Sequence, residues 1–289
     1  MKMKLAQRLL IGYYKNKLKA IALLSPRKAA ETAFNIFCTP FDNKLPKTSP
    51  PIFHKAEKLS FVLNGDKVRG FRWMPTKPNG KKILIVHGFR SYAYKFETYV
   101  QVLLKEGFEV VAFDAPAHGT SDGKIINAYI YRQALDRIEK DHGPFYGIMG
   151  HSLGGLSASL AFENLPDQQN RKLVLIAPAE TERAINSFLE IIPLSEKVME
   201  EFTGLINEIT DKPISYYSTG RVVKNLTSPV LWVHDMHDPI CPFEDTAPIR
   251  ALNLPHVRFF ITQKLGHNKM YRDGKVCAEI VHFFTVGAA

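Results

Sequence analysis

The sequence of 289 residues has only three cysteines, Cys38, Cys241 and Cys277. Their odd number, wide separation and lack of C-x-x-C spacing argue against a disulfide scaffold and against a thiolate zinc site. No stretch approaches the roughly 20 uninterrupted apolar residues of a membrane-spanning helix, and the first residues lack an apolar run that ends in a small-residue cleavage site. We therefore expect an intracellular, cytoplasmic protein.

Acidic residues are scarce at the start of the chain. The net charge is +10, and residues 1–60 carry +9 of it, with twelve Lys and Arg against three acidic residues. Apolar residues recur there at broadly helical spacing among the basic ones: Leu5, Leu9, Ile11, Tyr14, Leu18, Ile21 and Leu24. One interpretation is a basic amphipathic helix on an anionic membrane, at its inner face; the other is a helix docked on its own domain with a solvated basic face. No recognised nucleic-acid module accompanies the charge, so no nucleic-acid partner is expected.

Two further signals organise the first part of the chain. Ser25-Pro26 predicts the start of a second helix that reaches about Phe37, and a Pro-rich connector follows it. Asn64-Gly65 lies between two short apolar segments, which predicts a β-hairpin that leads into a sheet. We therefore assign residues 1–58 to a basic helical N-terminal extension and residues 59–289 to the main domain.

From Lys81 onward, short apolar runs alternate with segments of helical character. Such runs suit strands that are buried on both faces of a parallel sheet. We expect an α/β fold, with a mostly parallel sheet and helices on both of its faces. The expected strands are 83–86, 110–113, 146–149, 173–176, 230–233 and 257–261. The expected helices are at about 94–105, 126–141, 153–164, 244–253 and 273–284.

The alternation has one long break, between Ile176 and Val230. About fifty residues pass there without a strand, and too many of them are apolar for a free loop. We expect a small helical cap at about 180–225, over the carboxyl edge of the sheet, where open α/β sheets bind ligands. A purely structural insertion is the alternative.

The hexapeptide Gly150-His151-Ser152-Leu153-Gly154-Gly155 contains the pattern G-x-S-x-G. It follows an expected strand and precedes an expected helix, which is the context of a turn that exposes a nucleophilic serine. The glycines allow the backbone to fold closely around Ser152. The start of the helix offers N–H groups to developing negative charge, and Leu153 N–H is the first of them.

Two more loops complete a family resemblance. His87-Gly88-Phe89-Arg90 follows the strand at 83–86, and residues 114–121 resemble the turn D-x-P-G-H-G-x-S, with Ala117 in place of the usual glycine. Together with the serine motif, these segments resemble the α/β-hydrolases of the esterase, lipase and lysophospholipase type. The resemblance implies that Phe89 supplies the second oxyanion N–H, and that His87 and His118 shape the loops around the site.

The same resemblance implies an acid and a base after the serine, in the order Ser, acid, His. His267 follows the last expected strand and is the expected base. Asp238 is the expected acid that orients it, with Asp235 as the alternative. His234, Asp235, His237 and Asp238 together also resemble metal ligands. Adjacent side chains of an extended segment point in opposite directions, so we expect no metal there.

These residues predict a serine hydrolase that cleaves carboxylic esters through an acyl-enzyme and needs no cofactor. The apolar insertion favours a hydrophobic acyl substrate, as in a carboxylesterase, monoacylglycerol lipase or lysophospholipase. Arg90 is a candidate for binding a phosphate or carboxylate of the substrate. Hydrolysis of thioester, peptide or carbon–carbon bonds by the same residues is the alternative, and a non-catalytic membrane-surface binding module is a more remote one. The sequence leaves the oligomeric state and the physiological substrate open.

Overall fold

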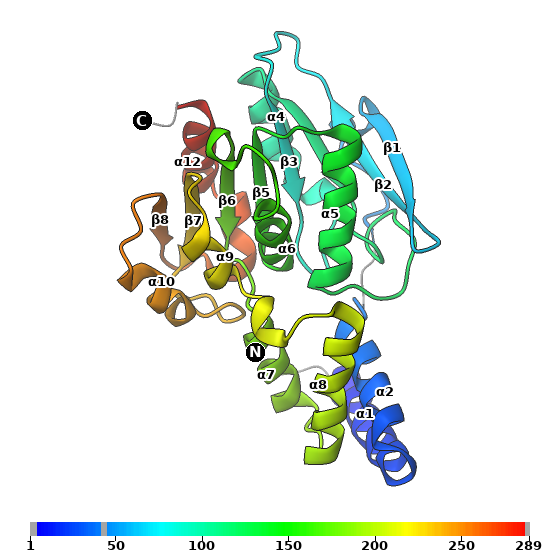
Figure 1. Cartoon of the computed structure of the whole chain (residues 1–289). Coiled ribbons are helices and arrows are strands. Elements are labelled where there is room, and N and C mark those ends of the chain that lie inside the picture. The colour runs from blue at the N-terminus through cyan, green and yellow to red at the C-terminus, as the bar shows by residue number, and fades with distance from the viewer. Residues whose placement is uncertain (1–4, 42–44, 287–289) are drawn as a thin grey trace. The chain divides into compact units, whose positions relative to one another are not determined.

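The apolar runs of the sequence form a sheet of eight strands, in the order β1-β2-β4-β3-β5-β6-β7-β8 (Figure 1). β1 pairs antiparallel with β2, and β2 with β4; the other pairs are parallel. The computed structural model describes residues 5–41 and 45–286. The strands are β1 (Glu57–Leu63), β2 (Asp66–Trp73), β3 (Lys82–Val86), β4 (Glu109–Phe113), β5 (Gly147–His151), β6 (Lys172–Ile176), β7 (Val230–Asp235) and β8 (Val257–Thr262).

The chain divides into two compact units, and the larger one contains the sheet. This sheet unit comprises the described parts of residues 40–180 and 218–289. Its helices are α3 (Pro51–His54), α4 (Glu97–Lys105), α5 (Ala128–His142), α6 (Leu153–Phe162), α9 (Thr219–Asn225), α10 (Ala247–Ala251), α11 (Gly266–Lys269) and α12 (Gly274–Thr285). All the residues proposed for chemistry lie in this unit.

The smaller, helical unit joins two segments that are far apart in the sequence, residues 5–39 and 181–217. It contains α1 (Leu5–Leu24), α2 (Pro26–Cys38), α7 (Thr181–Ile191) and α8 (Glu196–Thr210). Ser25 caps α2 by accepting a hydrogen bond from Lys28 N–H, and Pro26 occupies the first turn, as the sequence signal predicts.

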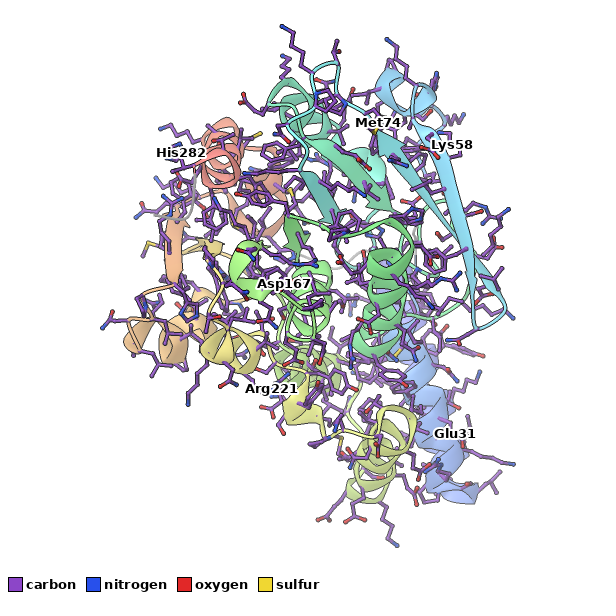
Figure 2. The ribbon with its side chains drawn as sticks, turned by 45° about the horizontal axis from the view of Figure 1, so that its top comes forward. Glu31, Lys58, Met74, Asp167, Arg221 and His282 are labelled. Atoms are coloured by element: carbon purple, nitrogen blue, oxygen red, sulfur yellow. The ribbon has the colours of Figure 1, made fainter. Side chains whose placement is uncertain are left out.

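Aromatic rings and one arginine hold α2 to the later segment. The ring centroids of Phe37 and Phe188 are 5.4 Å apart, and those of Phe34 and Phe202 are 6.0 Å apart, both with edge-to-face geometry. Arg27 Nη1 donates to Glu208 Oε1 over 2.9 Å, and its Nε donates to Glu31, which is labelled in Figure 2. These contacts explain why the N-terminal helices and the insertion form one unit.

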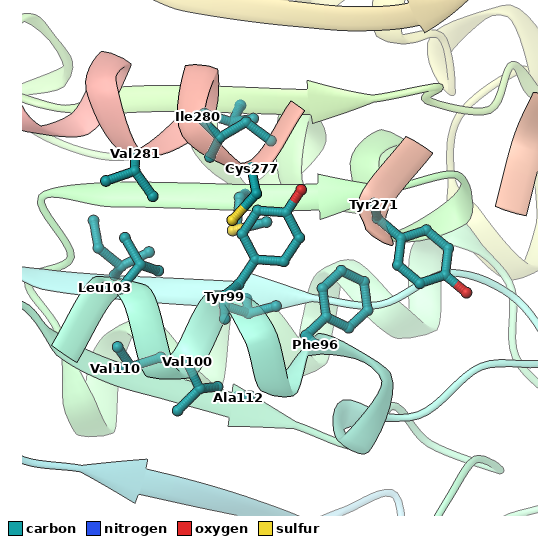
Figure 3. Close-up of a cluster of buried hydrophobic side chains, with 14 of the residues drawn as sticks. Phe96, Tyr99, Val100, Leu103, Val110, Ala112, Tyr271, Cys277, Ile280 and Val281 are labelled. Carbon is teal, nitrogen blue, oxygen red and sulfur yellow. The ribbon is translucent and has the colours of Figure 1, made fainter. Parts of the chain in front are cut away.

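The core of the sheet unit lies on both faces of the central strands, because neighbouring residues of a buried strand point to opposite sides. Ile83 and Ile85 of β3 join a cluster with α4 and α12, which Figure 3 shows in close-up. α5 and α6 pack against each other on the opposite face, in front of the sheet in Figure 1. Apolar side chains therefore fill both layers, as expected for runs without alternation.

The fold class predicted from the sequence is confirmed: the sheet is mostly parallel, with helices on both faces. Two predicted helices are shorter than expected. The segment at 94–105 begins as a 3₁₀ turn, Ala93–Phe96, before α4. The segment at 244–253 divides into a 3₁₀ turn, Phe243–Thr246, and α10, where a proline occupies the first turn of the α-helix.

Two buried tyrosines give a test of the core. In the described part of the chain, Tyr99 Oη has no hydrogen-bond partner, whereas Tyr131 Oη donates to His87 O over 3.1 Å. A buried hydroxyl without a partner costs stability, and a bonded one contributes about 1 kcal/mol. Tyr99→Phe should therefore leave the free energy of unfolding equal or higher, while the matched variant Tyr131→Phe should lower it by about 1 kcal/mol. Urea denaturation of both variants checks this, and an equal loss of stability in the two would contradict it.

Candidate active site

Ser152 lies in a strained turn between β5 and α6. Its φ of +55° is in the left-handed region, and its ψ is −124°; such a conformation is costly for a residue with a side chain. Surrounding contacts hold it: Ser152 N–H donates to Ile176 O over 3.0 Å, and Ser152 O accepts from Gly155 N–H and Leu156 N–H. The side chain of Ser152 is thus presented at the carboxyl edge of the sheet, ahead of a helix.

The glycines of this turn are required because backbone meets backbone. A Cβ atom on Gly150 would lie 2.5 Å from Gly154 O, and one on Gly154 would lie 2.3 Å from His87 O. The first N–H groups of a helix have no acceptor within it, and in α6 the series begins at Leu153. The Leu153 N–H therefore stands beside Ser152, at the positive end of the helix.

His267 and Asp238 meet in the loops that follow β8 and β7. His267 Nδ1 and Asp238 Oδ2 are 2.8 Å apart, and both side chains are buried. Asp238 Oδ1 also accepts from Ile240 N–H over 2.8 Å and from Cys241 N–H over 3.0 Å. With its Nδ1–H directed to the carboxylate, the imidazole keeps the lone pair of Nε2 free to accept a proton.

Asp235 has a different set of partners. Its carboxylate accepts from His237 N–H, Thr262 Oγ1–H and Leu265 N–H over 2.8 to 2.9 Å. Burial opposes ionisation of this carboxyl, but these hydrogen bonds outweigh it and lower the pKa of Asp235. Asp235 thus ties the end of β7 to the loop that leads to His267, while Asp238 bonds the imidazole itself.

His151 and Cys241 also belong to the site, although no motif of the sequence indicates a role for either residue. His151 Nε2 lies 3.0 Å from His267 O, and the two rings pack with centroids 4.7 Å apart. The Cys241 thiol lies beside the side chain of Ser152, and burial raises the pKa of this thiol. These contacts connect the strand that carries Ser152 with both loops that carry Asp238 and His267. The position of His151 directly before the serine was the available signal.

His87 orients the loop after β3. Because Ala115 N–H can only donate, His87 Nε2 accepts that bond over 2.9 Å, and Nδ1–H donates to Gly88 O over 2.8 Å. The C=O and N–H of a trans peptide point in opposite directions, so the Phe89 N–H points away from the His87 ring. A Cβ on Gly88 would lie 3.0 Å from Ser152 Cβ, which places this peptide next to the serine.

His118 fixes the next residue of the same loop. His118 Nε2 accepts from Arg90 N–H over 2.9 Å, and Nδ1–H donates to Pro116 O over 3.0 Å. Arg90 has a φ of +55° and is exposed. Burial lowers the pKa of His87 to about 4 and that of His118 to about 3. Both rings are therefore neutral near pH 7 and act here as hydrogen-bonding supports of the loop.

The segment at 234–238 contains the four side chains that resemble metal ligands, and protein groups already bind His234. His234 Nε2 bonds Cys241 O over 2.8 Å, and its Nδ1 accepts from Trp232 Nε1–H over 3.2 Å. Among the residues that the structure describes, no three His, Cys, Asp or Glu side chains are arranged to hold a metal ion. Each nitrogen of the His234 ring is thus already occupied by a protein partner.

Several known proteins that this chain resembles are named as hydrolases. Residues 77–212 match the family model described as serine aminopeptidase, S33. A serine hydrolase-like protein of Dictyostelium discoideum is 29% identical over 129 residues, which cover 43% of this chain and 36% of the relative. Putative esterase/lipase 3 of Mycoplasma pneumoniae is 27% identical over 113 residues, 39% of this chain and 42% of the relative. The chain therefore spans less than half the length of these curated relatives.

Solved structures resemble the chain over more of its length. An esterase of Pyrococcus furiosus has a TM-score of 0.61 at 18% identity, with 83% of this chain and 96% of that chain covered. Est1E of Butyrivibrio proteoclasticus, solved with ferulic acid, has a TM-score of 0.60 at 18% identity, with 78% and 96% covered. At such identities the likeness establishes the fold.

The neutral state of His118 has a consequence for stability against pH. The pKa of His118 is about 3 in the folded protein, against an ordinary value of 6.5 that applies to the unfolded chain. As the pH falls, the unfolded chain is therefore protonated at His118 before the folded protein is. The free energy of unfolding should therefore decrease from about pH 6 to about pH 4, with His118 contributing about 1.4 kcal/mol per pH unit. In His118→Gln, whose amide oxygen can still accept from Arg90 N–H, urea denaturation across this range should give a slope smaller by that amount. Identical slopes in the two proteins would refute the neutral state.

Proposed function

We propose that this chain, which has the α/β-hydrolase fold, is a serine hydrolase that cleaves carboxylic esters through an acyl-enzyme. The 2.8 Å bond between His267 Nδ1 and Asp238 Oδ2 is the observation that carries this proposal. It unites residues 29 positions apart in the sequence, and His151 connects their loop to the strand before Ser152. Nucleophile, acid and base then follow the order Ser152, Asp238, His267 in the chain.

In the proposed reaction, His267 Nε2 takes the proton of Ser152 Oγ as the oxygen attacks the ester carbonyl. Proton transfer makes the imidazole a cation, and the Asp238 carboxylate stabilises that cation in a buried site. The three hydrogen bonds that Asp238 accepts keep it in the position to do so. The acid is thus an orienting and stabilising group; it does not itself receive the proton.

The negative charge that develops on the carbonyl oxygen needs hydrogen-bond donors. Phe89 N–H and Leu153 N–H are the proposed pair, one from the loop after β3 and one from the start of α6. The support for Phe89 is the bond from His87 Nδ1–H to Gly88 O, which fixes the plane of the Gly88–Phe89 peptide. Preorganised donors of this kind are worth roughly 10²- to 10³-fold in rate each.

The second half of the reaction reverses the first. His267 gives its proton to the leaving alcohol as the tetrahedral intermediate collapses to the acyl-enzyme. It then takes a proton from water, which attacks the acyl carbonyl, and returns that proton to Ser152 Oγ as the acid product leaves. The protein supplies no redox or group-carrier step in this sequence.

The proposed substrate is an ester with a hydrophobic acyl group, of the carboxylesterase, monoacylglycerol lipase or lysophospholipase kind. Its support is the apolar composition of the insertion at 180–225 and the esterase and lipase names of the relatives. Arg90 is proposed to bind an anionic group of such a substrate, because it is exposed directly after the loop that carries Phe89.

The same three residues also suit thioester or peptide hydrolysis. The matched family model is described as serine aminopeptidase, and a thioesterase domain from the curacin biosynthetic pathway shares the fold with a TM-score of 0.58. Carbon–carbon hydrolysis is a further reaction open to this set. A panel of matched ester, thioester and aminoacyl amide substrates separates these activities.

A fluorophosphonate probe and an ester series test the nucleophile and the acyl preference together. The wild-type protein should be labelled, and kcat/KM should rise from acetyl to longer acyl esters. Ser152→Ala should abolish labelling and reduce hydrolysis by at least about a thousandfold. Arg90→Ala should raise KM for substrates that carry a phosphate and leave neutral esters unchanged. Undiminished hydrolysis by folded Ser152→Ala would refute the mechanism.

Asp238 and Asp235 provide a matched pair. Asp238→Asn retains the size of the side chain but cannot stabilise the imidazolium, so kcat/KM should fall by about 10³- to 10⁴-fold with little change in folding. Asp235→Asn should mainly reduce stability, because that carboxylate holds the loop at Leu265. Esterase kinetics and thermal unfolding of both variants distinguish the roles. A folded Asp238→Asn protein with full activity, or a larger rate loss in Asp235→Asn, would exclude the assignment.

A further inference from the structure

Helix α1 has two apolar faces that lie on opposite sides of it. Leu18 is only 4% exposed, and Ile11, Tyr14 and Ile21 on the same side are partly buried. An α-helix turns by about 100° per residue. On this basis a second set of apolar residues lies on the opposite side of α1, within about a third of the helix circumference. This set is Leu5, Leu9, Tyr13, Ala20, Leu23 and Leu24, which we call the outer face of α1; one polar residue, Asn16, lies among them.

The outer face of α1 is exposed along its length. Leu9 is 66% exposed, Tyr13 58% and Leu24 91%. The helix has 20 residues, so the row extends over about 30 Å. Single exposed apolar side chains are ordinary, but several large ones exposed together on one face mark an interaction surface.

Positive charges border this row on both sides. By the same helical geometry, Arg8, Lys15 and Lys19 lie along one border and Lys17 along the other. α1 contains no Asp or Glu. Within the described residues, none of these four cations is paired with a carboxylate. α2 differs, because its Arg27 is surrounded by Glu31, Glu201 and Glu208.

The charge decides which partner fits. A second copy of the same face would bring two sets of unpaired cations together, and like charges repel. A nucleic acid would engage the cations but leave the apolar row in water. An anionic bilayer satisfies both features: apolar side chains enter the boundary between headgroups and acyl chains, while long Lys and Arg side chains reach the phosphates.

We propose that the outer face of α1 binds the surface of an anionic lipid bilayer, with the helix lying in the plane of the interface. None of the helices in the described ranges is long and apolar enough to cross a membrane, which agrees with a helix that lies on one. α1 is already folded against α2, so binding does not have to order it. The proposal concerns where the protein binds and does not depend on the reaction at Ser152.

Vesicle flotation of the full chain tests the proposal. The wild-type protein should float with phosphatidylcholine vesicles that contain phosphatidylserine, and binding should weaken in high salt or without phosphatidylserine. Leu9→Gln/Tyr13→Gln should lower the partition coefficient at least tenfold. The matched control is Val62→Gln/Met74→Gln, whose parent side chains are similarly exposed, at 60% and 57%, and lie in the sheet unit; Met74 is labelled in Figure 2. This control should bind as the wild type does.

The charge and the independence from catalysis are tested in the same assay. Lys17→Gln/Lys19→Gln should weaken binding by about fivefold per cation, whereas Lys77→Gln/Lys105→Gln, which removes two exposed lysines of the sheet unit, should not. Ser152→Ala should float as the wild type does. Failure of the wild type to float, or unchanged flotation of the outer-face variant, overturns the proposal. It is also overturned if the wild type is a dimer in light scattering that this variant converts to a monomer, because the face then joins two copies.

Discussion

The site depends on one close approach, at which the loop after β3 meets the turn after β5 with no side chain between them. A Cβ atom on Gly154 would lie 2.3 Å from His87 O, which no packing rearrangement of side chains could relieve. The same loop sets the Gly88 residue against Ser152, because a Cβ atom on Gly88 would lie 3.0 Å from Ser152 Cβ. The proposed oxyanion donors, the position of the serine and the strained φ at Ser152 therefore depend on the same approach.

Charge around the site is controlled by burial. Desolvation lowers the pKa of His87, His118 and His151, so these rings stay neutral and use their nitrogens to hold backbone groups. A cation at any of them would oppose a second cation on His267, which the proposed reaction requires. His267 is the ring that has a carboxylate partner, Asp238. One imidazole thus has the carboxylate partner that the proposed proton transfer requires, and the neighbouring ones support the loops.

Local patterns predicted the sheet and Ser152, because strands buried on both faces appear as apolar runs and because the serine motif lies within six residues. The resemblance to α/β-hydrolases, and not a local pattern, indicated Phe89, Asp238 and His267. What the sequence could not give are contacts between distant segments. His151 bonds the backbone of His267 across 116 positions, and Cys241 contacts Ser152 through its thiol. The choice of Asp238 over Asp235 rested on family resemblance. In the structure Asp238 bonds the His267 ring, whereas Asp235 bonds backbone N–H groups and Thr262. The spacing of the two residues along the chain does not predict this difference.

For the N-terminal helix, too, the sequence does not show which residues contact other segments. Periodicity identified an apolar stripe on α1, broad enough for docking on its own domain or on a membrane, but a period cannot say which residues another element covers. In the structure Leu18 is buried and Leu9 exposed, so the helix docks within its unit and still presents a second apolar row between cations. Docking fixes the helix before any partner arrives. The helix loses its conformational entropy when the protein folds, and membrane binding does not have to offset that cost again. The strength of binding then depends on the exposed side chains and on the lipid charge alone.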